Sequence, residues 1–180
     1  KLPEKWTDEF AHLLGWLTGD GCVRRGVKGV PGNQDTATWI YSREDRETFL
    51  DRHQRTLADI VGFDPKPSEQ PNGTVQLRSS RGAFIEFLIG LGVTTASAVR
   101  KRLPSAILEA PVEVQAAFLR GLYDADGCAA RTNNETRYVG LGSVSIELLR
   151  DVQRLLSSFG IGGRIYATRK RGDAHFAYTT

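Results

Sequence analysis

The sequence predicts an α+β protein made of two similar halves, each an αββαββα unit. One stretch is written twice, at residues 13–21 and again at residues 119–127, and each copy follows an apolar run with helical spacing. A similar order of strand and helix patterns follows each copy. The copies lie about 106 residues apart, which is long for a solenoid repeat and suits one half of a duplicated domain.

Glycines recur at matching places in the two copies. The copies are Leu13-Leu14-Gly15-Trp16-Leu17-Thr18-Gly19-Asp20-Gly21 and Leu119-Arg120-Gly121-Leu122-Tyr123-Asp124-Ala125-Asp126-Gly127. Gly15 or Gly121 on the buried face of a helix lets a second backbone come unusually close, and the natural partner is the other copy. Gly21 and Gly127 suit the left-handed position that ends a helix. We therefore expect two closely packed helices that end side by side.

Each copy also places an aspartate just before its last glycine, Asp20 in the first and Asp126 in the second. The last turn of a helix carries the negative end of the helix dipole, so a carboxylate there is unfavourable by roughly 0.3–1 kcal/mol. Pairing the two helices brings two such acids together. A divalent cation with hard oxygen ligands, Mg²⁺ or similar, would stabilise this cluster.

Both stretches resemble the LAGLIDADG (dodecapeptide) motif of homing endonucleases, and the second is close to the family consensus. The resemblance implies a pseudo-two-fold monomer that cuts DNA. The two motif helices would form the interface between two four-stranded antiparallel sheets that bind DNA. The resemblance also implies that Asp20 and Asp126 bind metal, with the carbonyl groups of Gly19 and Ala125 facing the same ions.

The first copy departs from the motif. It has Trp16 inside the stretch, and Thr18 stands where the second copy has Asp124. The earlier acid of the motif is usually a structural helix-end residue, so the resemblance does not make Asp124 a ligand. The departure raises the question of whether both active sites are equally competent.

Each expected element of the first half has a local signal. Thr7 or Asp8 can cap the first helix, which would run to about Asp20. Residues 36–42 alternate apolar and polar side chains as a half-buried strand does, and Asn72-Gly73 is a strong hairpin signal. The other expected elements are strands at 22–28 and 74–80 and helices at 43–61 and 83–91.

The second half repeats this order in fewer residues. Its motif helix would run from about 112 to 126, and residues 145–159 have a strongly amphipathic helical pattern. Strands are expected at 128–131, 137–143, 164–168 and 174–180. The final helix of the unit is missing, so we expect that the chain ends early or that a parent protein continues. The expected boundaries are 1–94 for the first half-domain, 95–111 for a connecting segment and 112–180 for the second half-domain.

Lysine residues near the predicted acids could take part in catalysis. Metal ions held by Asp20 and Asp126 could activate a water and neutralise phosphate charge, and a lysine could stabilise the developing charge. In the intein-borne branch of the resembled family, a Lys-x-Ile-Pro segment precedes the second motif, and its lysine reaches the active site. Lys101 matches that lysine, with Leu103 in place of Ile. We name Lys170 as its counterpart in the second half.

Strand residues on the outward faces of the two sheets would recognise DNA in the major groove. A one-residue error in register would move each strand to its other face. The candidates alternate along the expected strands or lie in basic groups: Arg24, Thr36, Thr38, Ser42, Gln76 and Arg78 in the first half, and Arg131, Arg137, Tyr138, Arg164, Tyr166 and Thr168 in the second.

Composition is compatible with these expectations. The 180 residues are 40% hydrophobic with a formal net charge of +3, which permits nucleic-acid binding without proving it. The sequence shows neither a signal peptide nor a membrane-length apolar run, so we expect a soluble intracellular protein of the cytoplasm or nucleoid. The chain contains no Met and begins at Lys1, which suggests an excised or processed segment.

Cysteine and histidine offer no second site. Cys22 and Cys128 occupy matching places, and we expect small buried residues rather than a disulfide. His12, His53 and His175 are dispersed in the sequence, and we expect ordinary structural histidines rather than a zinc site.

We predict a monomeric, Mg²⁺-dependent, site-specific double-strand DNA endonuclease, which by resemblance would leave 3′ overhangs. Mn²⁺ would substitute for Mg²⁺, and Ca²⁺ would support binding without cutting. One alternative is a non-cleaving DNA- or RNA-binding relative, such as an intron maturase or a regulator; retention of both acids favours the nuclease, although a maturase can retain them. Another is the endonuclease portion of an intein, although the segment lacks the residues needed to splice alone.

Overall fold

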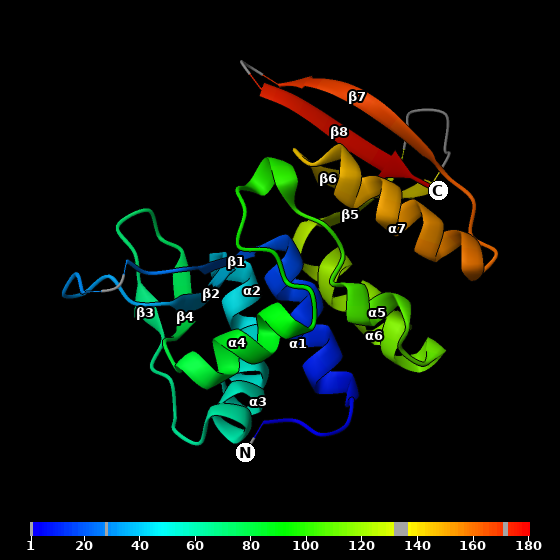
Figure 1. Cartoon of the computed structure of the whole chain (residues 1–180). Helices are drawn as coiled ribbons and strands as arrows, with labels where there is room; N and C mark the ends of the chain where they lie inside the picture. Colours follow the sequence, from blue (N-terminus) through cyan, green and yellow to red (C-terminus); the bar gives the residue numbers. More distant parts are fainter. Residues whose placement is uncertain (1, 28, 132–136, 171–172) are drawn as a thin grey trace.

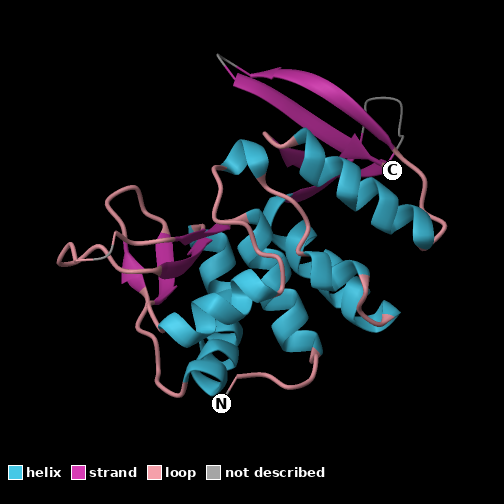
Figure 2. Cartoon of the chain, viewed as in Figure 1, coloured by secondary structure: helices cyan, strands magenta, loops and turns pink. Residues whose placement is uncertain are grey.

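The computed structural model describes residues 2–27, 29–131, 137–170 and 173–180, with the side chains of residues 168–175 left out. It is an α+β protein with two four-stranded antiparallel sheets and two central helices, and the sheets lie to either side of those helices (Figures 1 and 2). This fold is the one predicted. No helix within the described ranges has the length and apolarity that crossing a membrane requires.

The central pair consists of α1 (Asp8–Gly19) and α6 (Val112–Asp126), which make the most extensive contact between helices in the described chain. Two glycines explain how closely they pack. A Cβ placed on Gly15 would lie 2.1 Å from the carbonyl oxygen of Phe118, and one on Gly121 would lie 2.0 Å from that of His12. The predicted backbone approach through Gly15 and Gly121 is therefore confirmed.

The last glycines of the two copies act differently from the prediction. Neither Gly21 nor Gly127 has a positive φ, so the left-handed helix end expected there is wrong. Gly21 instead begins β1 and Gly127 begins β5. A Cβ on Gly21 would lie 2.7 Å from the carbonyl oxygen of Leu17, and one on Gly127 would lie 2.4 Å from that of Tyr123. Glycine is needed at both places because the chain turns tightly from helix into strand.

The first sheet has the order β1-β2-β4-β3. Its strands are β1 (Gly21–Arg24), β2 (Thr36–Tyr41), β3 (Ser68–Glu69) and β4 (Val75–Ser79). The hairpin between β3 and β4 turns at Gly73, whose φ of 83° is the conformation that the Asn-Gly signal predicted. The second sheet has the equivalent order β5-β6-β8-β7, with β5 (Gly127–Arg131), β6 (Arg137–Ser143), β7 (Arg164–Lys170) and β8 (Asp173–Thr179).

Helices cover the inner faces of both sheets. In the first half these are α2 (Arg43–Asp45), a π-helical turn η1 (Arg46–Leu50), α3 (Asp51–Val61) and α4 (Gly82–Gly90); in the second half, α7 (Ile146–Ser158). The single helix expected at 43–61 is thus interrupted by η1. The buried apolar side chains of both halves form one cluster, so the halves share a core.

The connecting segment contains a 3-10 turn, η2 (Ala98–Arg100), and a short helix, α5 (Ser105–Leu108). Between them, Leu103 is buried against the core. The segment therefore packs as part of the fold and carries Lys101 past the ends of the central helices.

Candidate active site

The two predicted acids meet where the central helices end. Asp126 is the last residue of α6, and Asp20 directly follows α1. A Cβ placed on Gly19 would lie 2.9 Å from the Cβ of Ala125 and 3.1 Å from Oδ2 of Asp126. The carboxylate of the second copy therefore lies against the backbone of the first. The sequence prediction that the two helix ends adjoin is confirmed.

Lys101 reaches the same place from the connecting segment. Its Nζ donates a hydrogen bond to the carbonyl oxygen of Gly19, one of the two carbonyls predicted to face a metal. Burial lowers the pKa of Lys101, while the negative charges of Asp126 and Asp20 act in the opposite direction. The structure thus gathers an ammonium group and two carboxylates from three separate stretches of the chain.

The electrostatics of the acids indicate a site that lacks positive charge. Burial, followed by repulsion from Asp20, raises the pKa of Asp126 to about 6, although Lys101 acts against this rise. Burial also raises the pKa of Asp20, again opposed by Lys101 and reinforced by Asp45. Two carboxylates whose charged forms are disfavoured would be stabilised by a cation between them.

The donor set fits a hard divalent cation. Within the described part of the chain, no three His, Cys, Asp or Glu side chains gather to hold a metal by themselves. A cation at Asp20 and Asp126 would therefore complete its shell with backbone carbonyls, water and phosphate oxygens. Mg²⁺ is commonly bound in this way, through one or two carboxylates plus substrate phosphates.

The difference between Thr18 in the first motif copy and Asp124 in the second has a structural explanation. In the second copy, Oδ2 of Asp124 lies 2.8 Å from Nε2 of His12 on α1. In the first copy, the buried Thr18 donates to the carbonyl oxygen of Leu14, 2.9 Å away and within its own helix. His12 occupies the place in α1 that Phe118 occupies in α6. The polar pair therefore exists across one side of the interface, with Phe118 and Thr18 at the equivalent positions on the other.

Two of the histidines, dispersed in the sequence, lie together in the structure as buried, hydrogen-bonded residues. His12 Nδ1 lies 2.9 Å from His53 Nε2, and His53 Nδ1 lies 2.9 Å from the hydroxyl of Tyr41. Burial lowers the pKa of His53 to about 3, so both its charge and its solvent contact are lost in the fold. His12 and His53 are separated along the chain by β1, β2, α2 and η1, and no spacing in the sequence indicates their contact.

The outward face of the first sheet carries most of its predicted residues together. The register places Thr38 between Cys22 on β1 and Arg78 on β4, and it pairs Arg24 with Thr36. Arg78 donates a hydrogen bond to Gln76, two residues along the same strand. Thr38 is enclosed by these neighbours and is only 6% exposed.

Ser42 does not belong to that face. The strand ends at Tyr41, and the Ser42 hydroxyl caps α2, accepting a bond from the Asp45 backbone N–H at 3.2 Å. The structure places Ile40, which pairs with Gln76, on the outward face instead. The alternating pattern of β2 contained that signal, but only its polar members were chosen as candidates.

The predicted residues of the second sheet are divided between its two faces. Arg131 pairs with Arg137, and the alternation puts both on the face opposite Tyr138. Strand alternation thus turns the Cα–Cβ bonds of Arg131 and Arg137 away from that of Tyr138. Tyr138, Arg164 and Tyr166 line one hollow of about 680 Å³ on the outward face, and the side chain of Arg137 reaches the same hollow. Thr168 and Lys170 lie in β7, but their side chains fall outside the described residues.

Both cysteines are free and exposed rather than buried, which corrects another expectation. Cys22 and Cys128 take equivalent positions on the outward faces, beside Thr38 and Gly140 respectively. Strand alternation explains the exposure, because Gly21 and Gly127, one residue earlier, face the helices.

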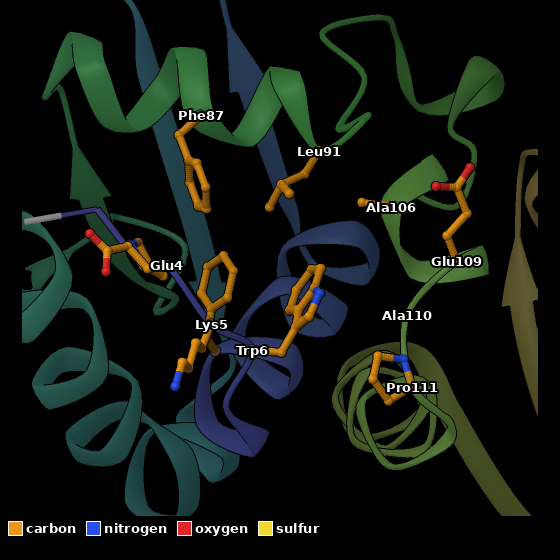
Figure 3. A pocket seen from close by; sticks show the side chains of 11 residues that line it. Glu4, Lys5, Trp6, Phe87, Leu91, Ala106, Glu109, Ala110 and Pro111 are labelled. Carbon is orange, nitrogen blue, oxygen red and sulfur yellow. The ribbon is translucent and has the colours of Figure 1, made fainter.

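A separate pocket lies away from the acids, between the lead-in, the end of α4 and the connecting segment (Figure 3). It has a volume of about 380 Å³ and is lined chiefly by apolar side chains, among them Trp6, Phe87, Leu91 and Pro111. Trp6 also stacks on Phe10, with ring centroids 5.5 Å apart. None of the predicted site residues lines this pocket, so we assign it to packing of the lead-in.

Comparison with known proteins shows what this chain and its fold resemble. Residues 113–180 match the family described as LAGLIDADG-like domain. Over the whole chain, the fold is that of LAGLIDADG homing endonucleases.

Solved structures give the particular likenesses. A mesophilic variant of the homing endonuclease I-DmoI has a TM-score of 0.69 at 19% identity, covering 96% of this chain and 89% of its own. I-SmaMI bound to uncleaved DNA in the presence of calcium ions has a TM-score of 0.56 at 13% identity, covering 98% and 79%. The N-terminal LAGLIDADG domain of WhiA has a TM-score of 0.52 at 15% identity, covering 99% and 78%.

Curated relatives match nearly the whole chain but only part of their own length. The tRNA-splicing ligase RtcB of Pyrococcus abyssi is 28% identical over 94% of this chain and 20% of its own length. The ribonucleoside-diphosphate reductase NrdEB subunit alpha of Bacillus subtilis is 40% identical over 92% of this chain and 16% of its own length. The replicative DNA helicase DnaB of a Synechocystis species is 26% identical over 96% and 20%. The chain thus spans less than a third of each of these relatives.

Proposed function

We propose that this chain is a site-specific double-strand DNA endonuclease that requires a divalent metal ion. The observation that carries the proposal is the convergence of Asp20, Asp126 and Lys101 at the ends of the central helices, between two outward-facing sheets. The fold and the LAGLIDADG-like match over residues 113–180 support it.

The chain's own residues have distinct parts in the reaction. Asp20 and Asp126 would hold the cation, with the carbonyl groups of Gly19 and Ala125 close by. When bound, the cation supplies a more acidic water and neutralises charge on the phosphate. Lys101 would lie beside the scissile phosphate and stabilise negative charge that develops there. Lys170 remains our candidate for the equivalent part in the second half.

Recognition would come from the outward faces of the sheets. Arg24, Thr36, Thr38, Gln76 and Arg78 present hydrogen-bonding groups on the first sheet, at the spacing of alternate strand residues. Tyr138, Arg164 and Tyr166 would contact DNA from the second sheet, with Thr168 next along the same strand. Major-groove base edges are distinguishable by such donors and acceptors, and phosphate contacts would make affinity strongly dependent on salt.

We propose Mg²⁺ as the main cofactor, with Mn²⁺ as a substitute and Ca²⁺ supporting binding without cutting. Crystal structures of I-DmoI with DNA and Mn, and with DNA and Ca, support divalent-metal use in this fold. We further propose a monomer with half-domains at 1–94 and 112–180 joined by 95–111. Its product would have 3′ overhangs.

We also propose that the chain is the endonuclease portion of an intein. The names of the relatives given above describe three different activities: a ligase, a reductase and a helicase. Each of these relatives nevertheless contains a segment similar to nearly all of this chain. A mobile segment carried by unrelated hosts explains that distribution. Because the substrate would be chromosomal DNA, we propose that the chain acts inside the cell, in the cytoplasm or nucleoid.

Cleavage of a randomised duplex library tests the proposed activity. The wild-type chain is incubated with Mg²⁺ and, in parallel, with Ca²⁺, and both cut and retained duplexes are sequenced. We expect a defined double-strand cut at one long site in Mg²⁺ and retention of the same site in Ca²⁺. Retention without any cut in Mg²⁺ or Mn²⁺ would contradict the nuclease and favour a maturase-like or regulatory DNA-binding role.

A further inference from the structure

We propose that Asp151 on α7 is a positioning residue for Lys101. Asp151 binds Arg102 of the connecting segment, and Ser145, the cap of α7, binds the backbone of Lys101. We call these three residues, Asp151, Arg102 and Ser145, the clamp. The inference rests on the proposed function for its catalytic consequence. Its structural content stands on contacts between the connecting segment and the second half, and it is measurable without any cleavage.

Asp151 is a buried carboxylate with several partners from the connecting segment. It is 5% exposed, and its two oxygens accept from Arg102 in a bidentate pair, at 2.6 Å from Nε and 2.8 Å from the terminal nitrogen. The backbone N–H of Leu103 also donates to Oδ2, at 3.3 Å. Such planar pairing fixes direction as well as distance, which a single-point contact does not.

Ser145 holds the carbonyl group of Lys101. This fully buried serine caps α7 by accepting from the Leu148 N–H at 3.2 Å, and it donates to the carbonyl oxygen of Lys101 at 2.8 Å. The backbone that follows the Lys101 Cα is therefore tied to α7 and its cap, through the Lys101 carbonyl, the Arg102 side chain and the Leu103 N–H. Lys101 itself lies in extended backbone just after η2, where no helix or strand would otherwise hold it.

The held segment spans the boundary between the halves. Its backbone is fastened to α7 in the second half, while the Lys101 Nζ donates to Gly19 at the end of α1 in the first. The long flexible side chain of a lysine loses considerable rotamer freedom at such a site. A backbone fixed at Arg102, Leu103 and the Lys101 carbonyl limits the remaining freedom to the side chain alone.

A buried ion pair could serve stability alone, so the test must report on Lys101 itself. Site-resolved acylation of the full-length chain, followed by mass spectrometry, measures the accessibility of each lysine in one sample. Lys66 is exposed and provides the internal reference. We expect Asp151→Asn to raise the acylation rate of Lys101 relative to Lys66 by roughly fivefold or more, because the segment opens locally more often.

Asp35→Asn is the matched control. Asp35 also accepts from an arginine, Arg25, and from a backbone N–H, that of Gly26, but it lies in the first half away from the connecting segment. We expect it to leave the Lys101 rate unchanged. Arg102→Gln provides a second variant in case Asp151→Asn fails to fold, because Arg102 is half-exposed. Unchanged Lys101 acylation in a folded Asp151→Asn or Arg102→Gln chain would overturn the proposal.

Single-turnover cleavage then tests whether the clamp acts through Lys101. We expect Asp151→Asn to slow cleavage about 10- to 100-fold with DNA affinity in Ca²⁺ within about twofold of wild type, and to have no further effect in a Lys101→Met background. An equal slowing in both backgrounds would overturn the catalytic part. If the wild-type chain cuts no DNA, the proposed function fails. The acylation rate of Lys101 still tests whether the clamp holds the Lys101 backbone.

Discussion

The first sheet turns charged and hydrogen-bonding side chains outward, whereas the outward face of the second sheet is built around small residues. On the first, Arg24, Thr36, Gln76 and Arg78 lie in adjacent cross-strand rows. On the second, the equivalent rows contain Ala130, Gly140, Gly142 and Ala177, flanked by tyrosines and Arg164. The two sheets therefore have the same order of strands, but the side chains on their outward faces are not similar.

The interface between the halves shows the opposite behaviour. Gly15 and Gly121 meet a carbonyl oxygen of the facing helix at almost the same distance, and Asp20 and Asp126 end the two helices together. Residues that fix the approach of two backbones cannot vary without separating the halves. Outward strand positions are free to change, because each contributes little to the shared core.

Substitution of the interface glycines should give the largest effect. We expect Gly15→Ala or Gly121→Ala to destabilise the protein by about 3–5 kcal/mol, because the new Cβ would lie within 2.1 Å of backbone on the facing helix. Gly142→Ala, where nothing lies within 4 Å, is the control and should change stability little. Urea denaturation measures all three. Similar stability of Gly15→Ala and Gly142→Ala would contradict the close packing.

Removing one acid charge should stabilise the metal-free protein. The pKa of Asp126, about 6, lies above its ordinary value of 3.8, so its contribution to stability is present below pH 3.8 and lost as pH rises through 6. We therefore expect Asp126→Asn to raise stability at pH 7 by up to about 3 kcal/mol. Asp124→Asn should instead lower it by about 1 kcal/mol by weakening the bond to His12. Thermal unfolding without divalent ions between pH 4 and 7 measures both; a destabilised Asp126→Asn would contradict the expectation.

The difference between the two faces should appear in sequence selectivity. We expect Gln76→Ala with Arg78→Ala to relax base preference at positions under the first sheet, by about 1–2 kcal/mol per lost base contact. Tyr166→Ala should weaken binding more evenly across sequences. Selection from a randomised library in Ca²⁺ compares the two variants. If Tyr166→Ala changed base preference as strongly as the first variant, the expected difference in base selectivity between the two sheets would be contradicted.

The buried histidine network of the first half should cause acid sensitivity. The pKa of His53, about 3, lies below its ordinary value of 6.5, so its contribution to stability is complete above pH 6.5 and decreases as pH falls towards 3. We expect up to about 1.4 kcal/mol of lost stability per pH unit in that window from this group. Denaturation at pH 7, 6 and 5 should show a shallower dependence for His53→Gln than for wild type. An unchanged slope would exclude His53 as the cause.

Features that depend on local spacing could be predicted from the sequence. The motif helices, the succession of helices and strands along the chain, the Gly15–Gly121 approach and the Asn72-Gly73 hairpin all follow from short-range patterns. The expectation for Gly21 and Gly127 failed because a strand begins at once, which makes the tight approach of Leu17 and Tyr123 carbonyls the governing contact. The preference for a left-handed glycine at a helix end does not take into account the strand that follows the helix here.

Features that depend on contacts between distant residues could not be predicted. The pairing of His12 with His53, and the clamp of Arg102 on Asp151, join stretches whose spacing carries no signal. The division of Arg131 and Tyr138 between two faces was implicit in strand alternation and was overlooked because both residue types suit DNA. Asp20 and Asp126 could be predicted because each half repeats the same short pattern.

The most direct test of the central claim is strand-resolved cleavage of the selected target in Mg²⁺ by the wild-type chain, Asp20→Asn and Asp126→Asn. Binding is measured in parallel in Ca²⁺. We expect the wild type to cut both strands, and each variant to lose double-strand cleavage by about 1,000-fold or more while still binding the target. Either variant cutting at the wild-type rate would contradict an active site formed by one acid from each half.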